Sequence, residues 1–565
     1  MSDSIYKNKY LKYKQKYLHL QLNINRINTD NTLELKIPSN CDSKSKVNET
    51  KPIHLDDCKS KVSIRDKKIV FLGCGAVAKA CLYYFHHFFN FDYTNVVIID
   101  MLQREREKPI VKHYLKNGST FLNKEVTEDN YKEFLNSLQL KEKDIIIDLT
   151  TRTPSLCFFK YCRLHSIFYL NTASEQYLVN GINSIALQHW NYEDIERKTD
   201  YCDNITSLIE QGMNPGLISS FVLKGIDDIA LHFINKNGGG DSGFGIGGGY
   251  GGGGDLELID LFNMKSKDRY RLLAKKLGIR VIHCSEIDTQ TVTSNTLKDK
   301  FYNTWSCVGL IDESLEGVEL AVGTHEKEIP LPKNQVYVNG MFSSSMLCKD
   351  ATVKSIVPLK MEDDSVTFTE IKGRAIQHGE CCSLYRLLSF DDYAPTMHYV
   401  YKLNKYADEM FNKLTNDELE NIVLDPERWE VLNLYNHDIE GNDNVGAFFV
   451  LDDSYTKENN FTWWTGSILS NEYVKNILKD NMTSATLVQI MCGILGGLYW
   501  ALLPENQNKG LCYGDDIDYK LVIPLMEKYL GNVYSGKTNG VKIDGHRLVD
   551  LVVSSSDDKV KFTHI

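Results

Sequence analysis

The pattern of apolar and polar residues predicts a strand, a tight turn and a helix near residue 70. Residues 69–72 (IVFL) form a short apolar run of strand type, and residues 73–78 read GCGAVA. Apolar residues then recur at helical spacing as far as Phe88. Gly73 permits the turn, and Gly75 lets a pyrophosphate approach the free N–H groups at the start of the helix. The stretch predicts the first unit of a dinucleotide-binding domain. An ordinary glycine turn is the alternative.

Three more apolar runs of strand type extend this unit into a sheet. They are residues 96–99 (VVII), 144–148 (DIIID) and 167–170 (IFYL). Because strand-like runs alternate with helical segments, we expect a parallel sheet. The sequence therefore predicts an α/β fold: a Rossmann-type domain followed by a second, α+β domain.

The acid at the end of the second strand indicates the type of dinucleotide. Asp100 can accept hydrogen bonds from the hydroxyls of the adenosine ribose, which favours NAD over NADP. A polar strand end is the alternative interpretation. Arg104 and Arg106 follow closely, so contact with a 2′-phosphate stays open.

Length, charge and cysteine content narrow the class of protein. A chain of 565 residues predicts two or three domains. The formal net charge of −11 argues against nucleic-acid binding and fits cationic small substrates. The 14 cysteines form no CxxC pair, which predicts reduced thiols, a cytoplasmic location and no metal site. The polar, lysine-rich N-terminus does not have the pattern of a signal peptide.

Polar and low-complexity segments divide the chain. Tyrosines at helical spacing among lysines predict a basic amphipathic helix at the N-terminus. Its docking on this chain or on a partner subunit is the simpler interpretation, and contact with a membrane surface or nucleic acid is the alternative. The predicted units are the helix at 1–21, a flexible linker at 22–65, the NAD-binding domain at 66–195, an α+β domain at 196–545 with a disordered glycine-rich insert at 238–254, and a tail at 546–565.

One uncharged run could be either a membrane-spanning helix or a helix buried inside the protein. Residues 485–503 are nearly long enough to span a bilayer. Because the surrounding C-terminal region is polar, we predict a buried helix and no membrane span. Gly493, Gly496 and Gly497 permit either close helix packing or the approach of a cofactor.

Short polar clusters carry the candidate chemistry. Taken singly, each has an ordinary alternative, such as a turn, a core tryptophan or a structural histidine. In order and wording they resemble the NAD-dependent homospermidine synthase family of bacterial type, within the saccharopine dehydrogenase-like group. The resemblance covers about residues 66–518, and its main pieces are FLGCGAVAKA, YLNTASE, GMNPGLISSF, SEIDTQ, FYNTWSCVGLIDESLEGVELAVGTHE, RAIQHGE, PTMHYVYKL and NMTSATLVQIMCGILGGLYWAL.

The resemblance implies an aminobutyl transfer in which NAD stays bound and is regenerated. Putrescine, or spermidine, loses a hydride to form an imine. The amine of a second putrescine displaces ammonia, and the returning hydride yields homospermidine. The family also suggests a homodimer. The alternatives are an NAD(P)-dependent amine or amino-acid oxidoreductase of the wider group, and a non-enzymatic NAD-binding scaffold.

The family match also implies roles for individual residues. Glu175 and Glu286 would anchor ammonium groups through charge-assisted hydrogen bonds. Trp305 would present its ring face to the cationic amine and iminium. Asn214 would orient the amine, and His378 would carry a proton.

Further residues would line the entry and the cofactor. Glu313 and Asp443 would steer cations inward. Asp148 stands where the family pattern has an asparagine near the nicotinamide, and its carboxylate either perturbs the cofactor contact or points away. The predicted cofactor contacts are Gly73, Gly75, Ala76, Val77, Asp100, Thr150 and Thr172.

Overall fold

The computed structural model describes most of the chain from residue 61 onward. The described residues are 61–174, 178–179, 182–198, 205–237, 255–293, 297–315, 318–326, 344–347, 351–362, 365–390, 392–458, 460–541, 543, 545, 547 and 551–553. The predicted N-terminal helix, nearly all of the linker, the glycine-rich insert and most of the tail lie outside these residues, as does Glu175. Strand β1 (Val62–Ser63) pairs with β3 (Phe89–Asn90), so regular structure begins before residue 66.

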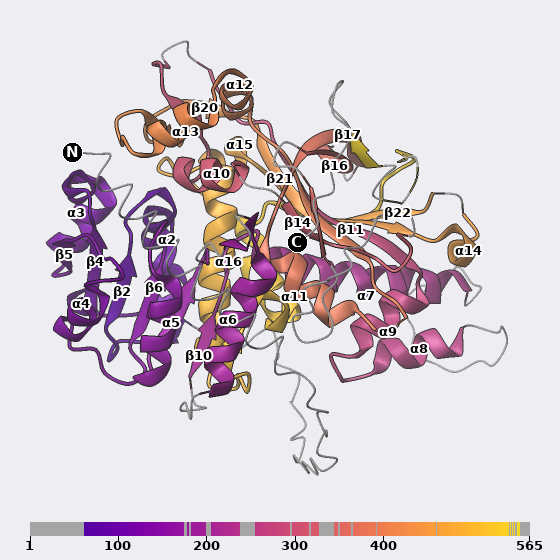
Figure 1. Ribbon diagram of the computed structural model, residues 1–565, viewed down its shortest axis with the longest axis horizontal. Helices are drawn as coiled ribbons and strands as arrows, with labels where there is room; N and C mark the ends of the chain where they lie inside the picture. The colour runs from indigo at the N-terminus through magenta and orange to yellow at the C-terminus, as the bar shows by residue number, and fades with distance from the viewer. Residues whose placement is uncertain are drawn as a thin grey trace, which may run out of the picture. The chain divides into compact units, whose positions relative to one another are not determined.

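Seven parallel strands form the sheet of the dinucleotide-binding domain, in the order β23-β10-β7-β6-β2-β4-β5. All four predicted strand runs lie in it, and the predicted α/β fold class with a Rossmann-type domain is confirmed. Figure 1 shows its first strands in indigo. The strands are β2 (Ile69–Leu72), β4 (Val96–Asp100), β5 (Thr120–Asn123), β6 (Ile145–Asp148), β7 (Phe168–Asn171), β10 (Thr206–Leu208) and β23 (Gly510–Cys512).

Helices connect these strands, because parallel neighbours require a crossover. Helix α2 buries an apolar face that includes Cys81, Tyr84 and Phe85, with the helical spacing read from the sequence. The crossover elements are α2 (Ala76–Phe88), η2 (Tyr93–Asn95), η3 (Gln103–Glu107), α3 (Pro109–Lys116), α4 (Tyr131–Ser137), α5 (Ser155–Leu164), the hairpin β8 (Leu178–Val179) and β9 (Ile182–Asn183), and α6 (Ile185–Lys198).

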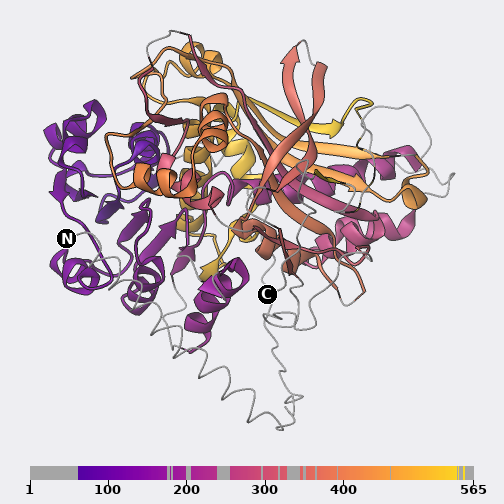
Figure 2. The same cartoon turned by 45° about the horizontal axis from the view of Figure 1, so that its top comes forward.

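A ten-stranded mixed sheet is the centre of the second domain. Its main order is β24-β22-β21-β11-β18-β17-β16-β25; in addition, β14 pairs with β18, and β15 pairs with β14. Strands β11 and β18 run parallel, and the hairpin of β16 and β17 extends beyond its neighbours (Figure 2). The predicted α+β class is confirmed. The strands are β11 (Ile279–Asp288), β14 (Val318–Ala321), β15 (Ser344–Leu347), β16 (Thr352–Glu362), β17 (Ser365–Ile376), β18 (Thr396–Lys402), β21 (Asn442–Leu451), β22 (Thr462–Ser470), β24 (Asn532–Lys537) and β25 (Val552–Val553).

Helix α7 (Leu217–Asn237) packs on β21 and β22 and covers one face of this sheet. Smaller elements surround both sheets. They are α8 (Leu256–Asn263), α9 (Arg269–Lys276), β12 (Thr291–Val292), β13 (Phe301–Asn303), α10 (Cys307–Ser314), α11 (Gly379–Leu388), α12 (Lys405–Lys413), α13 (Asn416–Val423), β19 (Trp429–Val431), β20 (Ile439–Glu440), α14 (Asp453–Thr456), α15 (Asn471–Asn476), η4 (Gly514–Asp516), α17 (Tyr519–Met526) and η5 (Glu527–Tyr529).

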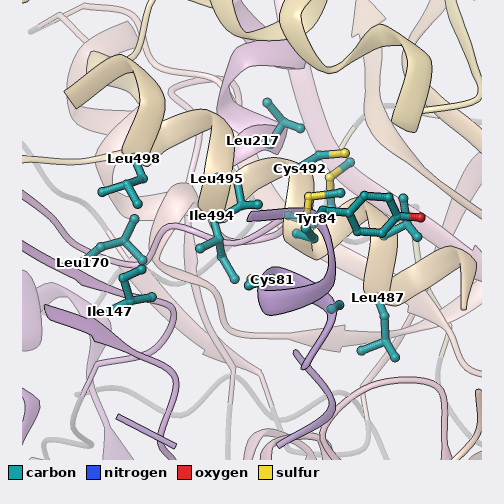
Figure 3. Packing of buried hydrophobic residues seen from close by; sticks show 14 of the residues in the cluster. Cys81, Tyr84, Ile147, Leu170, Leu217, Leu487, Cys492, Ile494, Leu495 and Leu498 are labelled. Carbon is teal, nitrogen blue, oxygen red and sulfur yellow. The ribbon is translucent and has the colours of Figure 1, made fainter. Parts of the chain in front are cut away.

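The uncharged run is helix α16 (Ala485–Leu502), and the prediction of a buried helix is confirmed. It is the one helix among the described residues that is long and apolar enough to cross a membrane, and 89% of it is buried inside the protein. Figure 3 shows its leucines among side chains of α2 and the parallel sheet. A Cβ at Gly493 would collide with the carbonyl oxygen of Gly212, and one at Gly497 would lie 2.7 Å from the side chain of Gln211. These two glycines therefore serve close packing.

Candidate functional site

The glycine turn between β2 and α2 leaves room for an anion. Gly73 has φ +86°, and a Cβ there would lie 2.8 Å from the carbonyl oxygen of Leu149, so this position requires glycine. A Cβ at Gly75 would meet no atom within 4 Å. No side chain caps the start of α2, and its first turn contains no acid. The free N–H groups therefore face open space that fits a pyrophosphate.

Asp100 holds this turn from the end of β4. The N–H of Cys74 donates to Asp100 Oδ2 at 2.6 Å, and the N–H of Leu102 donates to Oδ1 at 2.7 Å. Burial raises the pKa of Asp100 against the effect of these hydrogen bonds. Arg104 is engaged elsewhere, since it pairs with Glu427. The carboxylate thus stands where a ribose hydroxyl would meet the turn.

Asp148 points into the protein, which decides between the two interpretations of this residue. The hydroxyl of Tyr169 donates to Oδ2 at 2.8 Å, and the N–H of Thr150 donates to Oδ1 at 3.2 Å. The Thr150 hydroxyl also donates to Oδ1. Burial raises the pKa of Asp148 to about 6. Because the Thr150 hydroxyl is used internally, its predicted contact with the cofactor stays a prediction.

A loop after β10 connects the cofactor turn to the second sheet. Asn171, at the end of β7, accepts the N–H of Glu210 at its side-chain oxygen and the N–H of Gln211 at its carbonyl, both at 2.7 Å. The loop then reaches Asn214, whose Nδ2 donates to Glu286 Oε2 at 2.6 Å. The carboxyl edge of the parallel sheet and strand β11 therefore meet at one place.

Three buried acids share one face of the second sheet. Glu286 and Asp288 are two residues apart on β11, and Asp443 on β21 lies opposite Asp288. Glu286 Oε2 also accepts the hydroxyl of Tyr399 at 2.6 Å. Oδ1 of Asp443 has no hydrogen-bond partner among the described residues. Burial and, less strongly, repulsion from Asp288 raise the pKa of Glu286 to about 7. Burial and repulsion from Glu286 and Asp288 raise the pKa of Asp443 well above its usual value.

Aromatic rings line the space beside these acids. Tyr399 and Tyr401 alternate on β18 and stack with ring centroids 5.7 Å apart. His378 stacks on Tyr399 at 4.2 Å. Trp305 is half-buried and lies beside the hydroxyl of Tyr401. The hydroxyl of Thr304 donates to Asp288 Oδ2 at 2.6 Å and so fixes the chain just before the tryptophan.

His378 stands between two further carboxylates. Its Nδ1 lies 3.3 Å from Glu380 Oε1, and its Nε2 lies 3.7 Å from Glu313 Oε2. Burial opposes the charged imidazole, but these carboxylates outweigh it and raise the pKa of His378 well above its usual range. Within the described part of the chain, both oxygens of the buried Glu380 lack a hydrogen-bond partner. The group is suited to hold a proton and to meet a cation.

A possible set of metal ligands lies behind Glu380. The ligand atoms of Cys284, Glu380 and Cys381 are all buried and lie within 4.8 Å of one another. Two thiols and a carboxylate suit a thiophilic divalent ion such as Zn²⁺. Because Glu380 is shared, such an ion would compete with any cation bound near His378.

The structure thus brings together most of the residues that the family match singled out. Asn214, Glu286, Asp443, His378 and Glu313 converge with Trp305 beside them, and Thr172 lies near the loop at Gly212. Their roles stay predictions. Sequence reasoning did not single out Glu380, Asp288, Tyr399 or Tyr401, although all four lie in matched segments. For Asp288, Tyr399 and Tyr401 the signal was the alternation of side chains on a strand, which puts residues two apart on one face, whereas Glu380 lies at the start of α11 and carried no such signal.

Comparisons with known proteins agree with this arrangement. The saccharopine dehydrogenase NADP binding domain matches residues 69–203, and the saccharopine dehydrogenase C-terminal domain matches residues 212–531. Homospermidine synthases from Mesorhizobium japonicum and Blastochloris viridis are 27% and 26% identical. The alignments cover 84% and 85% of this chain and 91% and 93% of those proteins. The crystal structure of the Legionella pneumophila homospermidine synthase in complex with NAD shares the fold, with a TM-score of 0.67, 24% identity, and coverage of 87% of this chain and 99% of that one.

Proposed function

This chain belongs to the saccharopine dehydrogenase family, and we propose that within it the protein is a homospermidine synthase. It transfers an aminobutyl group between two putrescine molecules, or from spermidine to putrescine, and releases ammonia. The observation that carries the proposal is the cluster of buried carboxylates that have no lysine or arginine partner within the described residues: Glu286, Asp443 and Glu380. The two curated relatives of the same name support it.

A polyamine cation supplies the charge that this cluster lacks. Each charge-assisted hydrogen bond between an ammonium group and a carboxylate is worth about 1.5–3 kcal/mol. Asp443 and Glu380 have oxygen atoms free to accept such bonds within the described structure. Glu175, which lies outside the described residues, is the further ammonium anchor in the proposal. An alkyl chain with a charge at each end fits a site with acids on two sides.

The ring faces and His378 supply what the reaction needs besides charge. Trp305 attracts the cation through its ring, which contributes up to about 2 kcal/mol in a desolvated site. This contribution grows as positive charge develops on carbon, so it acts on the transition state. Asn214, held by Glu286, orients the reacting amine. His378, which holds its proton between Glu380 and Glu313, gives that proton to the leaving amine and takes it back later, while Glu313 and Asp443 draw the cation inward.

The turn at Gly75 and the acid Asp100 fit NAD, because the space before α2 is open and the carboxylate borders it. Gly73, Ala76, Val77, Thr150 and Thr172 complete the proposed contacts. NAD, when bound, supplies a hydride acceptor that later serves as the hydride donor. The chain itself positions the amine against the cofactor domain through the loop from Glu210 to Asn214.

The second candidate is an amine or amino-acid oxidoreductase of the same family. A substrate carboxylate would require a paired arginine, whereas the described lining offers Glu286, Asp443 and Glu380 with Trp305 and His378. The deciding experiment incubates the protein with NAD and putrescine deuterated on both carbons that bear nitrogen. The synthase yields homospermidine that retains all its deuterium, with one ammonia per product and no net NADH. Steady accumulation of NADH without homospermidine would favour the oxidoreductase, and samples without NAD are the control.

The proposal also includes a cytoplasmic homodimer, as the family resemblance implies. Light scattering of the full chain during gel filtration measures its mass against the 64.6 kDa of one subunit. A mass of one subunit at micromolar concentration would contradict the dimer. The predicted domain boundaries and the basic N-terminal helix also stay part of the proposal.

A further inference from the structure

Glu210 is a buried carboxylate outside the proposed substrate cluster. It follows β10 directly, has φ +58°, and is 5% exposed. Its N–H donates to the side chain of Asn171 at the carboxyl edge of the cofactor sheet. A left-handed backbone is unfavourable for a residue with a Cβ. The interactions of its side chain must therefore offset the energetic cost of that conformation.

The side chain of Glu210 belongs to a buried polar chain. Its Oε2 lies 2.8 Å from His189 Nε2, and His189 Nδ1 lies 3.4 Å from Arg386 Nη2. Because a guanidinium only donates, Nδ1 of the imidazole accepts and its Nε2–H donates to Glu210. His189 also stacks on Tyr513 at 4.5 Å, and Arg386 pairs with Glu193 of α6. The orientation of the Glu210 side chain is thus fixed by its hydrogen bond with His189, which Tyr513 and Arg386 hold in place.

The carboxylate lies against the first residue of α11. A Cβ built at Gly379 would lie 1.5 Å from Glu210 Oε2, so any other residue at this position must displace the carboxylate. The neighbours of Gly379 are His378 and Glu380, the two groups that face each other across 3.3 Å. An anion at a helix N-terminus is favourable. Arg386, on the same helix, connects α11 a second time to His189.

We propose that Glu210 is a positioning residue that sets His378 and Glu380 against the cofactor sheet. Its backbone is tied to Asn171 at the carboxyl edge of the cofactor sheet, and its side chain lies against the turn that carries the proton-transferring histidine. It acts through the α11 terminus and without contact with substrate. The inference depends on the proposed function in one respect only, namely the identity of the substrate on which His378 and Glu380 act.

A double-mutant cycle tests this contact. Gly379→Ala should lower kcat at least tenfold, because the new methyl group displaces the Glu210 carboxylate. In the Glu210→Ala background that carboxylate is absent, so adding Gly379→Ala should lower kcat by less than threefold. The control is Gly496→Ala, a packing change on α16 away from the site. Its effect on kcat and that of Glu210→Ala should simply multiply in the double variant. Fully multiplicative effects of Glu210→Ala and Gly379→Ala would overturn the proposal.

A second readout separates positioning from simple structural support. Glu210→Gln keeps an acceptor for His189 and a side chain of the same shape beside Gly379. It should therefore retain kcat within about threefold, whereas Glu210→Ala should lower kcat at least tenfold while KM for putrescine and the dissociation constant for NAD stay within twofold. An unchanged kcat in Glu210→Ala, or a rise of KM as large as the fall in kcat, would overturn the positioning role. If the wild type makes no homospermidine, the proposed function fails, but the same double-mutant cycle can be measured by melting temperature. The effects of Glu210→Ala and Gly379→Ala on the melting temperature should again be non-additive. The proposed function and the role of Glu210 can therefore fail independently of each other.

Discussion

Replacing Glu286 by glutamine should make the protein more stable and less active. Oε2 of Glu286 accepts both of its hydrogen bonds, from Asn214 and Tyr399, each at 2.6 Å. The carbonyl oxygen of a glutamine can keep both. Glutamine also removes a buried charge, since burial raises the pKa of Glu286 to about 7.

The size of both effects follows from this exchange. A buried charged group that is not fully compensated costs about 1–3 kcal/mol, so removing the charge of Glu286 should make the variant more stable by about that much near neutral pH. For a chain of 565 residues such a gain raises the melting temperature by about 1–3 °C. Loss of one charge-assisted bond to the substrate costs a similar energy, which lowers kcat/KM about 10- to 150-fold. Scanning fluorimetry and mass spectrometry of the product measure the two quantities.

The stability difference should also depend on pH. Because burial raises the pKa of Glu286, the folded wild type binds this proton more tightly than the unfolded chain does. Wild-type stability therefore falls as pH rises from the ordinary glutamate pKa of about 4.3 through the raised value. Glutamine does not titrate, so the advantage of the variant should be small at low pH and grow toward neutral pH.

Asp288 provides a matched control on the same face of β11. Its Oδ1 accepts the N–H and the side-chain amide of Gln290 at 2.9 and 3.0 Å, and Oδ2 accepts the hydroxyl of Thr304 at 2.6 Å. Asp288→Asn places an amide against donors and should cost about 1–3 kcal/mol. If Glu286→Gln also melts below the wild type and keeps full activity, the reasoning is refuted.

Three further predictions concern the cofactor turn, the tryptophan and the thiols. Gly73→Ala should lower the melting temperature, because of its positive φ and the nearby carbonyl of Leu149, whereas Gly75→Ala should fold normally and weaken NAD binding measured by calorimetry. Trp305→Ala should lower kcat about 3- to 30-fold with NAD affinity unchanged, and retained turnover would contradict its role. Micromolar Zn²⁺ should inhibit turnover by the wild type but not by the double variant Cys284→Ser/Cys381→Ser. Equal inhibition of the wild type and the double variant would exclude a metal site at these thiols.

Local patterns were sufficient for the cofactor half of the fold. Residues 69–72 and 96–99 are continuous apolar runs, as expected for strands that are covered on both faces. The glycines at 73 and 75 mark the turn because the need for glycine there comes from the local backbone. Asp100 could be placed because it directly follows a strand. Each of these features is contained within a few consecutive residues.

The pairing of distant segments could not be read in the same way. Strands β10 and β23 complete the parallel sheet from opposite ends of the second domain's sequence, and short strands of three residues carry little pattern. The direction of Asp148 depends on the hydroxyl of Tyr169 on the neighbouring strand. The matched segments contained Tyr399 and Glu380, but only the register of β11 with β18 and the start of α11 bring them to Glu286 and His378.

The acids of this protein separate into two groups by how well their oxygens are supplied with donors. Asp148 and Asp288 are deeply buried and accept several hydrogen bonds each, so removing them should harm the fold. Asp443 and Glu380 are equally buried, yet keep oxygens without a partner in the described structure. An unsatisfied buried carboxylate destabilises the protein, and a bound cation can relieve it. The shortage of hydrogen-bond donors, rather than burial or residue type, therefore distinguishes Asp443 and Glu380 from Asp148 and Asp288, whereas Glu286 is assigned to the polyamine by the family match and accepts two hydrogen bonds of its own.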